Sequence, residues 1–157
     1  DVMTTAKALG CGVPVGAFLM TEKVGANSLA AGDHGTTYGG NPLACAAICK
    51  VLALFEKEDV LANVERTGAY LGRCLDELVQ EFDCVKERRG VGLLQGLVFD
   101  RPVGNIITRA MDQGLVLINA GTDIIRFVPP LVIQEKHVDD MMVILRECIK
   151  EAEGEQK

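Results

Sequence analysis

Residues 34–44, with the sequence HGTTYGGNPLA, place two hydroxyl side chains and a pair of glycines directly before a predicted helix. Asn41 is a favoured N-cap residue and Pro42 is favoured at the first helical position, so we expect the helix to begin there. A helix N-terminus attracts phosphate through its free N–H groups and its dipole. The stretch therefore predicts a phosphate site at Thr36 and Thr37, with turn and capping roles for both threonines as the alternative.

A second stretch, residues 6–17 with the sequence AKALGCGVPVGA, places Lys7 immediately before a loop of small residues. Glycines at this density allow a bulky ligand to lie against the backbone. A lysine becomes nucleophilic when desolvation or a nearby cation lowers its pKa, and it needs a carbonyl carbon within reach. Lys7 is accordingly a candidate Schiff-base lysine. The alternative is an exposed lysine in a glycine loop.

Apolar periodicity and turn residues predict the elements of the rest of the chain. The predicted helices are 41–58, 59–82 (capped by Asp59), 103–113 (ended by Gly114) and 135–153, and the predicted strands are 13–20, two runs within 84–99, 115–118 and 124–128. Helices packed on a small sheet form an α+β domain. The glycine-rich motifs lie in residues 1–57 and the compact α/β pattern lies in residues 58–157, so a domain boundary is expected between them.

Arg126 is the only charged residue of the strand predicted over residues 124–128, where it lies between Ile125 and Phe127. A guanidinium buried in such a strand is costly unless an anion pairs with it. The partner is either an acidic side chain in a structural ion pair or the carboxylate of a substrate, and the sequence favours neither.

The composition limits the possible partners. With 16 Lys and Arg residues against 22 Asp and Glu residues, the formal net charge is −6, which repels nucleic acid and anionic membrane surfaces. An anionic small molecule remains possible, because a local arginine or lysine outweighs distant, screened surface charge.

The six cysteines include no C-x-x-C pair, and His34 and His137 do not fall at zinc-ligand spacing from them, so no metal site is expected. Cys45 and Cys49 lie four residues apart in an alanine-rich helical stretch and are expected to be small buried thiols. Free cysteines favour a reducing cytoplasm.

The chain begins at Asp1 without an initiator methionine, and we expect it to be a fragment.

Together the two glycine-containing stretches, in this order, resemble the class III (subgroup II) aminotransferases of the pyridoxal-phosphate fold-type-I superfamily. The resemblance continues through residues 88–97 (RRGVGLLQGL), 114–121 (GLVLINAG) and 124–133 (IIRFVPPLVI). It implies that the chain contains the end of the large cofactor-binding domain, followed by the small C-terminal α/β domain. It also implies small amino acid and 2-oxo acid substrates and a homodimeric full-length protein.

The resemblance also implies roles for four residues. Lys7 matches the lysine that binds pyridoxal phosphate covalently and carries a proton during transamination. Thr37 matches a threonine that holds the cofactor phosphate of the neighbouring subunit, and Thr36 matches a residue near the substrate. Arg126 matches an arginine that meets a substrate carboxylate or a gating glutamate.

Three functional groups of the family lie upstream of its lysine and have no counterpart in this chain. They are the aspartate that pairs with the pyridine nitrogen, the aromatic residue that stacks on the ring, and another substrate-binding arginine. Cys11 also stands where a glycine is usual. The alternative for the isolated chain is therefore a non-catalytic module that contributes packing and dimer contacts, with Lys7 idle.

Overall fold

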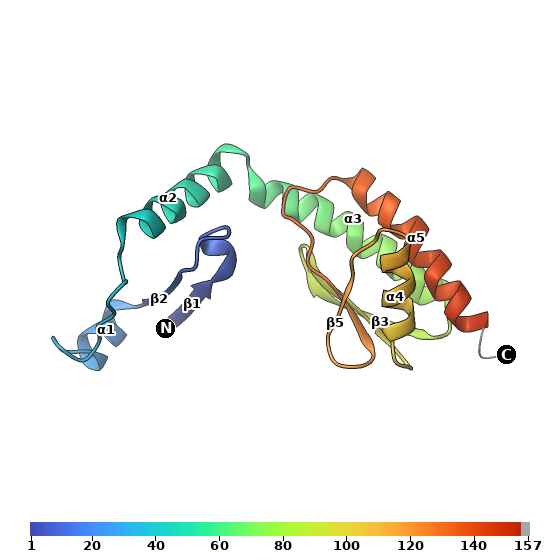
Figure 1. Ribbon diagram of the computed structural model, residues 1–157, viewed down its shortest axis with the longest axis horizontal. Coiled ribbons are helices and arrows are strands. Elements are labelled where there is room, and N and C mark those ends of the chain that lie inside the picture. The colour runs from blue at the N-terminus through green and yellow to red at the C-terminus, as the bar shows by residue number, and fades with distance from the viewer. Residues whose placement is uncertain (155–157) are drawn as a thin grey trace. The chain divides into compact units, whose positions relative to one another are not determined.

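The computed structural model describes residues 1–154, and the chain divides into two compact units (Figure 1). One unit runs from Asp1 to Asp59 and the other begins at Val60. The boundary expected from the sequence lay after residue 57. Within residues 1–154, no helix is long and apolar enough to cross a membrane.

The first unit begins with a two-stranded antiparallel sheet. Strand β1 (Val2–Ala6) pairs with β2 (Gly16–Met20), and the register runs from Val2 opposite Met20 to Ala6 opposite Gly16. The strand predicted over residues 13–20 is therefore shorter at its N-terminal end, because residues 13–15 belong to the connecting loop. A short helix, α1 (Glu22–Ser28), follows and was not predicted.

Helix α2 (Pro42–Lys57) begins as the sequence predicted. The Asn41 side chain accepts a hydrogen bond from the Ala44 N–H at 2.9 Å, and Pro42 occupies the first turn. The predicted capping role of Asp59 for the next helix, α3 (Val60–Glu81), is wrong. Asp59 has a φ of 47°, whereas an N-cap residue normally has an extended backbone.

The first unit has almost no core of its own. Among residues 1–59, only Gly10 and Ala44 are buried. Cys45 and Cys49 are exposed on α2, so the prediction that they are buried is wrong. Their helix buries only Ala44, while large apolar side chains such as Leu43 face outward.

In the second unit, four antiparallel strands form a sheet with the order β3-β4-β6-β5. The strands are β3 (Val85–Val91), β4 (Leu94–Phe99), β5 (Ile118–Asn119) and β6 (Ile124–Phe127). The strand predicted over residues 115–118 is wrong except for its last residue. The Leu115 N–H donates a hydrogen bond to the Ala110 carbonyl at 2.7 Å, so the backbone of Leu115 belongs to the end of the preceding helix and not to a strand.

Three helices cover one face of this sheet. They are α3, α4 (Gly104–Asp112) and α5 (Glu135–Gly154), and α5 runs alongside α3 in Figure 1. Their buried residues and those of the strands form one apolar core, which includes Leu71, Leu75, Leu78, Leu97, Ile106, Ile125, Leu145 and Ile149. The predicted α+β arrangement, helices packed on a small sheet, is confirmed.

The predicted stop of α4 at Gly114 is also confirmed. The Gly114 N–H bonds to the Met111 carbonyl at 2.9 Å, and Gly114 has a φ of 85°, in the region that favours glycine.

Candidate functional site

Lys7 lies at the point where the first hairpin opens into its loop. It starts a short 3₁₀ helix (η1, Lys7–Leu9) directly after the last strand pair, Ala6 with Gly16. Its φ is 54°, in the left-handed region that residues other than glycine seldom adopt. Backbone strain of this kind concentrates at functional sites, where the surrounding structure maintains it.

The loop leaves space beside Lys7. A hollow of about 480 Å³ is lined by Ala6, Lys7, Gly12, Val13, Pro14 and Val15. Gly10 closes the loop, because a Cβ atom there would lie 2.3 Å from the Val13 carbonyl oxygen. Lys7 itself is exposed, and its amine makes no ion pair or hydrogen bond to any of residues 1–154. The arrangement fits an amine that is available to a carbonyl-bearing ligand.

Thr36 and Thr37 both lie exposed in the loop that leads into α2. A tight turn follows them, in which the Gly39 N–H bonds to the Thr36 carbonyl at 3.3 Å. A Cβ atom at Gly39 would lie 2.1 Å from Cγ2 of Thr36, so a larger residue there would displace the Thr36 side chain. The turn holds both hydroxyl side chains just before the helix.

The N-terminus of α2 has few free donors for an anion. Pro42 has no N–H, and the Ala44 N–H is bonded to the Asn41 side chain. The Cys45 N–H is bonded to the Asn41 carbonyl at 3.0 Å. Only the Leu43 N–H of the first turn remains, so a phosphate there needs further donors such as the Thr37 hydroxyl.

Arg126 lies on β6 as predicted, but it is exposed. Ile125 and Phe127 point into the core, and Arg126 points to the opposite face of the sheet. The expectation that Arg126 is a buried charge in need of a partner is therefore wrong, because alternation along the strand places it outside. Within residues 1–154, its side chain makes no hydrogen bond or ion pair, so it is open to an anion.

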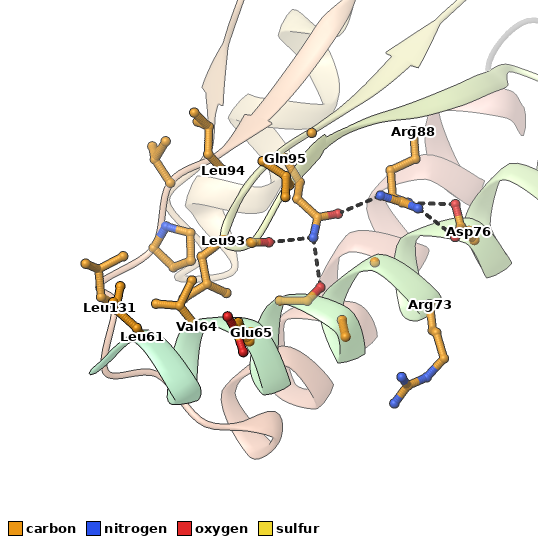
Figure 2. Close-up of a pocket in the computed structure, with 18 residues that line it drawn as sticks. Leu61, Val64, Glu65, Arg73, Asp76, Arg88, Leu93, Leu94, Gln95 and Leu131 are labelled. Atoms are coloured by element: carbon orange, nitrogen blue, oxygen red, sulfur yellow. Dashed lines mark hydrogen bonds and ion pairs between the residues drawn. The ribbon is translucent and has the colours of Figure 1, made fainter. Parts of the chain in front are cut away.

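A cavity of about 920 Å³ in the second unit contains a polar network that was not predicted from the sequence. Figure 2 shows Gln95 at its centre, between Arg88 and α3. Gln95 Nε2 donates to the carbonyls of Gly68 and Gly92 at 2.9 and 2.7 Å. Arg88 donates to both carboxylate oxygens of Asp76, at 2.7 and 3.1 Å, which raises the pKa of Arg88 above its ordinary value.

Apolar side chains line one end of this cavity, and charged Glu65 and Arg73 also lie on its wall. Figure 2 shows Leu61, Val64 and Leu131 at the end away from Asp76. Leu61 and Leu94 are exposed, at 65% and 59%. A sequence signal for the network existed, since Gln95, Leu97 and Phe99 alternate on the inward face of β4, and a polar residue at an inward position needs partners.

The predicted site residues belong to both units of the chain. Within residues 1–154, no hydrogen bond or ion pair links Lys7 with Thr36 or Thr37. Arg126 belongs to the other unit. Among residues 1–154, no three His, Cys, Asp or Glu side chains lie together in a group that could hold a metal ion.

Comparison with known proteins gives a single family. Residues 1–149 match the family model described as aminotransferase class-III. The chain is 46% identical over 147 residues to an acetylornithine aminotransferase of Gloeobacter violaceus, covering 92% of this chain and 36% of that protein. It is 41% identical over 152 residues to a mitochondrial acetylornithine aminotransferase of Yarrowia lipolytica, covering 96% and 37%. The chain thus spans less than half of the length of these relatives.

Solved structures agree in fold. The ornithine delta-aminotransferase of Plasmodium falciparum superposes with a TM-score of 0.88 at 32% identity, covering 96% of this chain and 39% of the other. An acetylornithine aminotransferase of Elizabethkingia anophelis superposes with a TM-score of 0.86 at 28% identity, covering 96% and 41%.

Proposed function

The chain belongs to the class-III aminotransferase family, and from this premise we propose that it supplies the cofactor-binding lysine and part of the substrate site of a pyridoxal-phosphate-dependent transaminase. The family match over residues 1–149 carries the proposal. The chain spans 36% of the length of one curated relative and 37% of another. The activity is therefore proposed for a full-length protein, meaning one that carries this chain together with the part of the family's fold outside it.

We propose that Lys7 holds the cofactor covalently and moves the proton at the substrate Cα. Its exposed amine, its left-handed backbone and the hollow beside it support this role. When bound, pyridoxal phosphate supplies an electron sink for the negative charge that develops on the substrate carbon. The last strand pair of the hairpin, Ala6 with Gly16, fixes the backbone directly before Lys7.

Thr37 is proposed to bind the cofactor phosphate of a neighbouring subunit, and Thr36 to lie near the substrate. The scarcity of free N–H groups at the start of α2 supports a role for the Thr37 hydroxyl, because the phosphate then needs a side-chain donor. In this proposal the full-length protein is a homodimer, and each site uses residues of two chains. Arg126 is proposed to bind a substrate carboxylate, which its exposure and lack of a described partner support.

For the amino donor we propose N2-acetylornithine, whose terminal amino group passes to 2-oxoglutarate, as in arginine biosynthesis. The names and identities of the curated relatives support this choice. Ornithine and 4-aminobutyrate are the rival donors, and one similar structure is an ornithine aminotransferase. The free cysteines fit a reducing compartment, and we propose the cytoplasm.

A panel of donors with the purified full-length protein tests the proposed activity. Turnover with 2-oxoglutarate is expected to be fastest with N2-acetylornithine. A clear preference for 4-aminobutyrate or ornithine would overturn the donor and leave the family role intact. Borohydride treatment followed by peptide mapping should find the reduced cofactor on Lys7, and cofactor fixed on another residue would remove Lys7.

The 157-residue chain by itself is proposed to be a non-catalytic packing and dimerisation module. The first unit has almost no buried residues, and its large apolar side chains are exposed. Packing against another chain would bury them, which supports this second role. Titration of the isolated chain with pyridoxal phosphate tests it. Covalent incorporation at Lys7 together with turnover of any donor would show that the isolated chain is catalytic.

A further inference from the structure

Gly10 lies at the junction of two consecutive turns that follow Lys7. The Gly10 N–H donates a hydrogen bond to the Lys7 carbonyl at 3.1 Å, which closes the first turn. The Val13 N–H donates to the Gly10 carbonyl at 3.1 Å, which closes the second turn. Gly10 therefore bonds in both directions along the chain, and it links Lys7 to the segment that returns to β2.

Gly10 is also one of the two buried residues of the first unit. A Cβ atom on Gly10 would lie 2.3 Å from the Val13 carbonyl oxygen and 2.6 Å from Cγ1 of Val15. The nearer of these two atoms belongs to the backbone, which has no rotamer to change. The second turn can thus fold back over the first only because residue 10 has no side chain.

The segment that folds back forms part of the hollow beside Lys7. Val13, Pro14 and Val15 line this space of about 480 Å³ together with Lys7. An added Cβ atom on Gly10 would have to displace the Val13 carbonyl by about 1 Å to reach an ordinary van der Waals distance. The shape of the hollow therefore depends on Gly10.

The backbone of Lys7 depends on the same turns. Its φ of 54° lies in the left-handed region, and such a conformation persists only where the surrounding structure maintains it. The strand pair Ala6 with Gly16 holds the chain before Lys7, and the hydrogen bond from Gly10 holds its carbonyl. Without that bond, Lys7 can return to the ordinary region. This return turns its Cα–Cβ bond and moves its amine.

We propose that Gly10 is a positioning residue for Lys7, which holds the lysine amine where the aldehyde carbon of pyridoxal phosphate meets it. Gly10 touches neither cofactor nor substrate and acts through the backbones of Lys7 and Val13. The bond that forms joins Lys7 Nζ to the aldehyde carbon, and the aldehyde oxygen leaves as water with two hydrogens of the neutral amine. The inference rests on the proposed function, since it requires Lys7 to bind the cofactor covalently.

The test compares Gly10→Ala with Gly25→Ala in the cofactor-free full-length protein. Gly25 on α1 is the control, because a Cβ atom there would meet only Sδ and Cγ of Met20, at 3.4 and 3.8 Å. Each protein is mixed with pyridoxal phosphate, and the product is trapped with borohydride and located on Lys7 by peptide mapping. Gly10→Ala should attach the cofactor at least about tenfold more slowly, because a misplacement of about 1 Å can cost a rate about 100-fold. Gly25→Ala should attach it at the wild-type rate.

A second ligand separates positioning from a purely structural role. Pyridoxamine phosphate has the same ring and phosphate but carries an amine in place of the aldehyde, so it binds without a bond to Lys7. Its Kd, measured by calorimetry, should stay close to the wild-type value in Gly10→Ala. If the attachment rate and the affinity for pyridoxamine phosphate fell together, Gly10 would only support the fold, and the proposal would be wrong.

Val15→Ala keeps the proposal falsifiable if Gly10→Ala folds poorly. It shortens a side chain that lies against Gly10 and adds no atom, so the hairpin should fold. The looser loop should slow attachment in the same direction, but less than Gly10→Ala does. Hydrogen exchange followed by mass spectrometry should be faster in residues 7–15 and unchanged in residues 16–20. Faster exchange with an unchanged attachment rate would show that the loop does not position Lys7, and an unchanged rate alone would also overturn the proposal.

Failure of this inference is distinguishable from failure of the proposed function. If the wild type fixes the cofactor on Lys7 and Gly10→Ala does so at the same rate, only the role of Gly10 is lost. If the wild type fixes no cofactor on Lys7, the proposed function is lost, and the role of Gly10 is lost with it.

Discussion

Gln95 on β4 is hydrogen-bonded to the backbone carbonyl of Gly68 on α3 at 2.9 Å, across 27 residues of sequence. The same amide bonds to the carbonyl of Gly92 in the turn between β3 and β4. A Cβ atom at Gly68 would lie 2.6 Å from the Gly92 carbonyl oxygen. The buried Gln95 side chain thus bonds the turn to α3. The turn can approach α3 this closely because Gly68 has no side chain.

Replacement of Gln95 by leucine should destabilise the second unit. The side chain is buried, and the substitution leaves the Gly92 carbonyl without its Gln95 donor at similar side-chain volume. We expect a loss of about 1–3 kcal/mol in the free energy of unfolding, measured by urea denaturation of the 157-residue chain. Gln80→Leu, at an exposed position of α3, is the control and should change the value by less than about 0.5 kcal/mol. Equal effects of the two variants would mean that the network contributes no stability.

Gly68→Ala should also destabilise, although alanine favours helix formation over glycine by about 1 kcal/mol. The added Cβ overlaps the backbone of Gly92, which cannot rotate away, so the turn must move. Gly104→Ala, at the start of α4 where a Cβ atom meets nothing within 4 Å, serves as the control and should be neutral or stabilising. A melting temperature for Gly68→Ala at or above that of the wild type would contradict the close approach of α3 and the turn.

Lys7→Ala in the full-length protein should abolish covalent fixation of the cofactor by borohydride. Turnover should fall at least about 100-fold, because the amine that moves the proton is lost. The fold should persist, since Lys7 is exposed and makes no side-chain bond to residues 1–154. Lys23→Ala, an exposed lysine on α1, is the control. Normal turnover by the Lys7 variant would rule out its proposed role.

Thr37→Ala should weaken retention of pyridoxal phosphate. A hydrogen bond to a charged phosphate contributes about 1.5–3 kcal/mol, or one to two decades in affinity. Turnover at saturating cofactor should change less, and Thr37→Ser should restore most of the affinity because it keeps the hydroxyl. An unchanged cofactor affinity with a lower melting temperature would instead identify Thr37 as a turn residue.

Local signals predicted much of this fold. Asn41 and Gly114 act through backbone hydrogen bonds to residues near them in sequence, and both predictions were confirmed. The errors have physical causes. Leu115 lies in an apolar run typical of a strand, but its N–H donates a hydrogen bond to the Ala110 carbonyl of α4. Asp59 is a favoured capping residue by type, but its left-handed backbone excludes that role.

The candidate site was less predictable, because much of it depends on contacts between distant residues. Lys7, Thr36 and Thr37 were identified from short motifs, and the structure adds backbone geometry without joining them. Gln95 was missed because its partner Gly68 lies on another element.

Arg126→Lys distinguishes a substrate role from a structural one. Lysine keeps the charge but loses the fork that gives a carboxylate two parallel hydrogen bonds, so the KM for glutamate and 2-oxoglutarate should rise about tenfold. The melting temperature should stay at the wild-type value, because Arg126 is exposed and has no bonded partner in residues 1–154. A lower melting temperature with normal kinetics per folded molecule would assign Arg126 to structure. Unchanged kinetics with both dicarboxylates would remove Arg126 from the substrate site. If its guanidinium binds a substrate carboxylate, replacing it with an ammonium group must change the KM for that substrate.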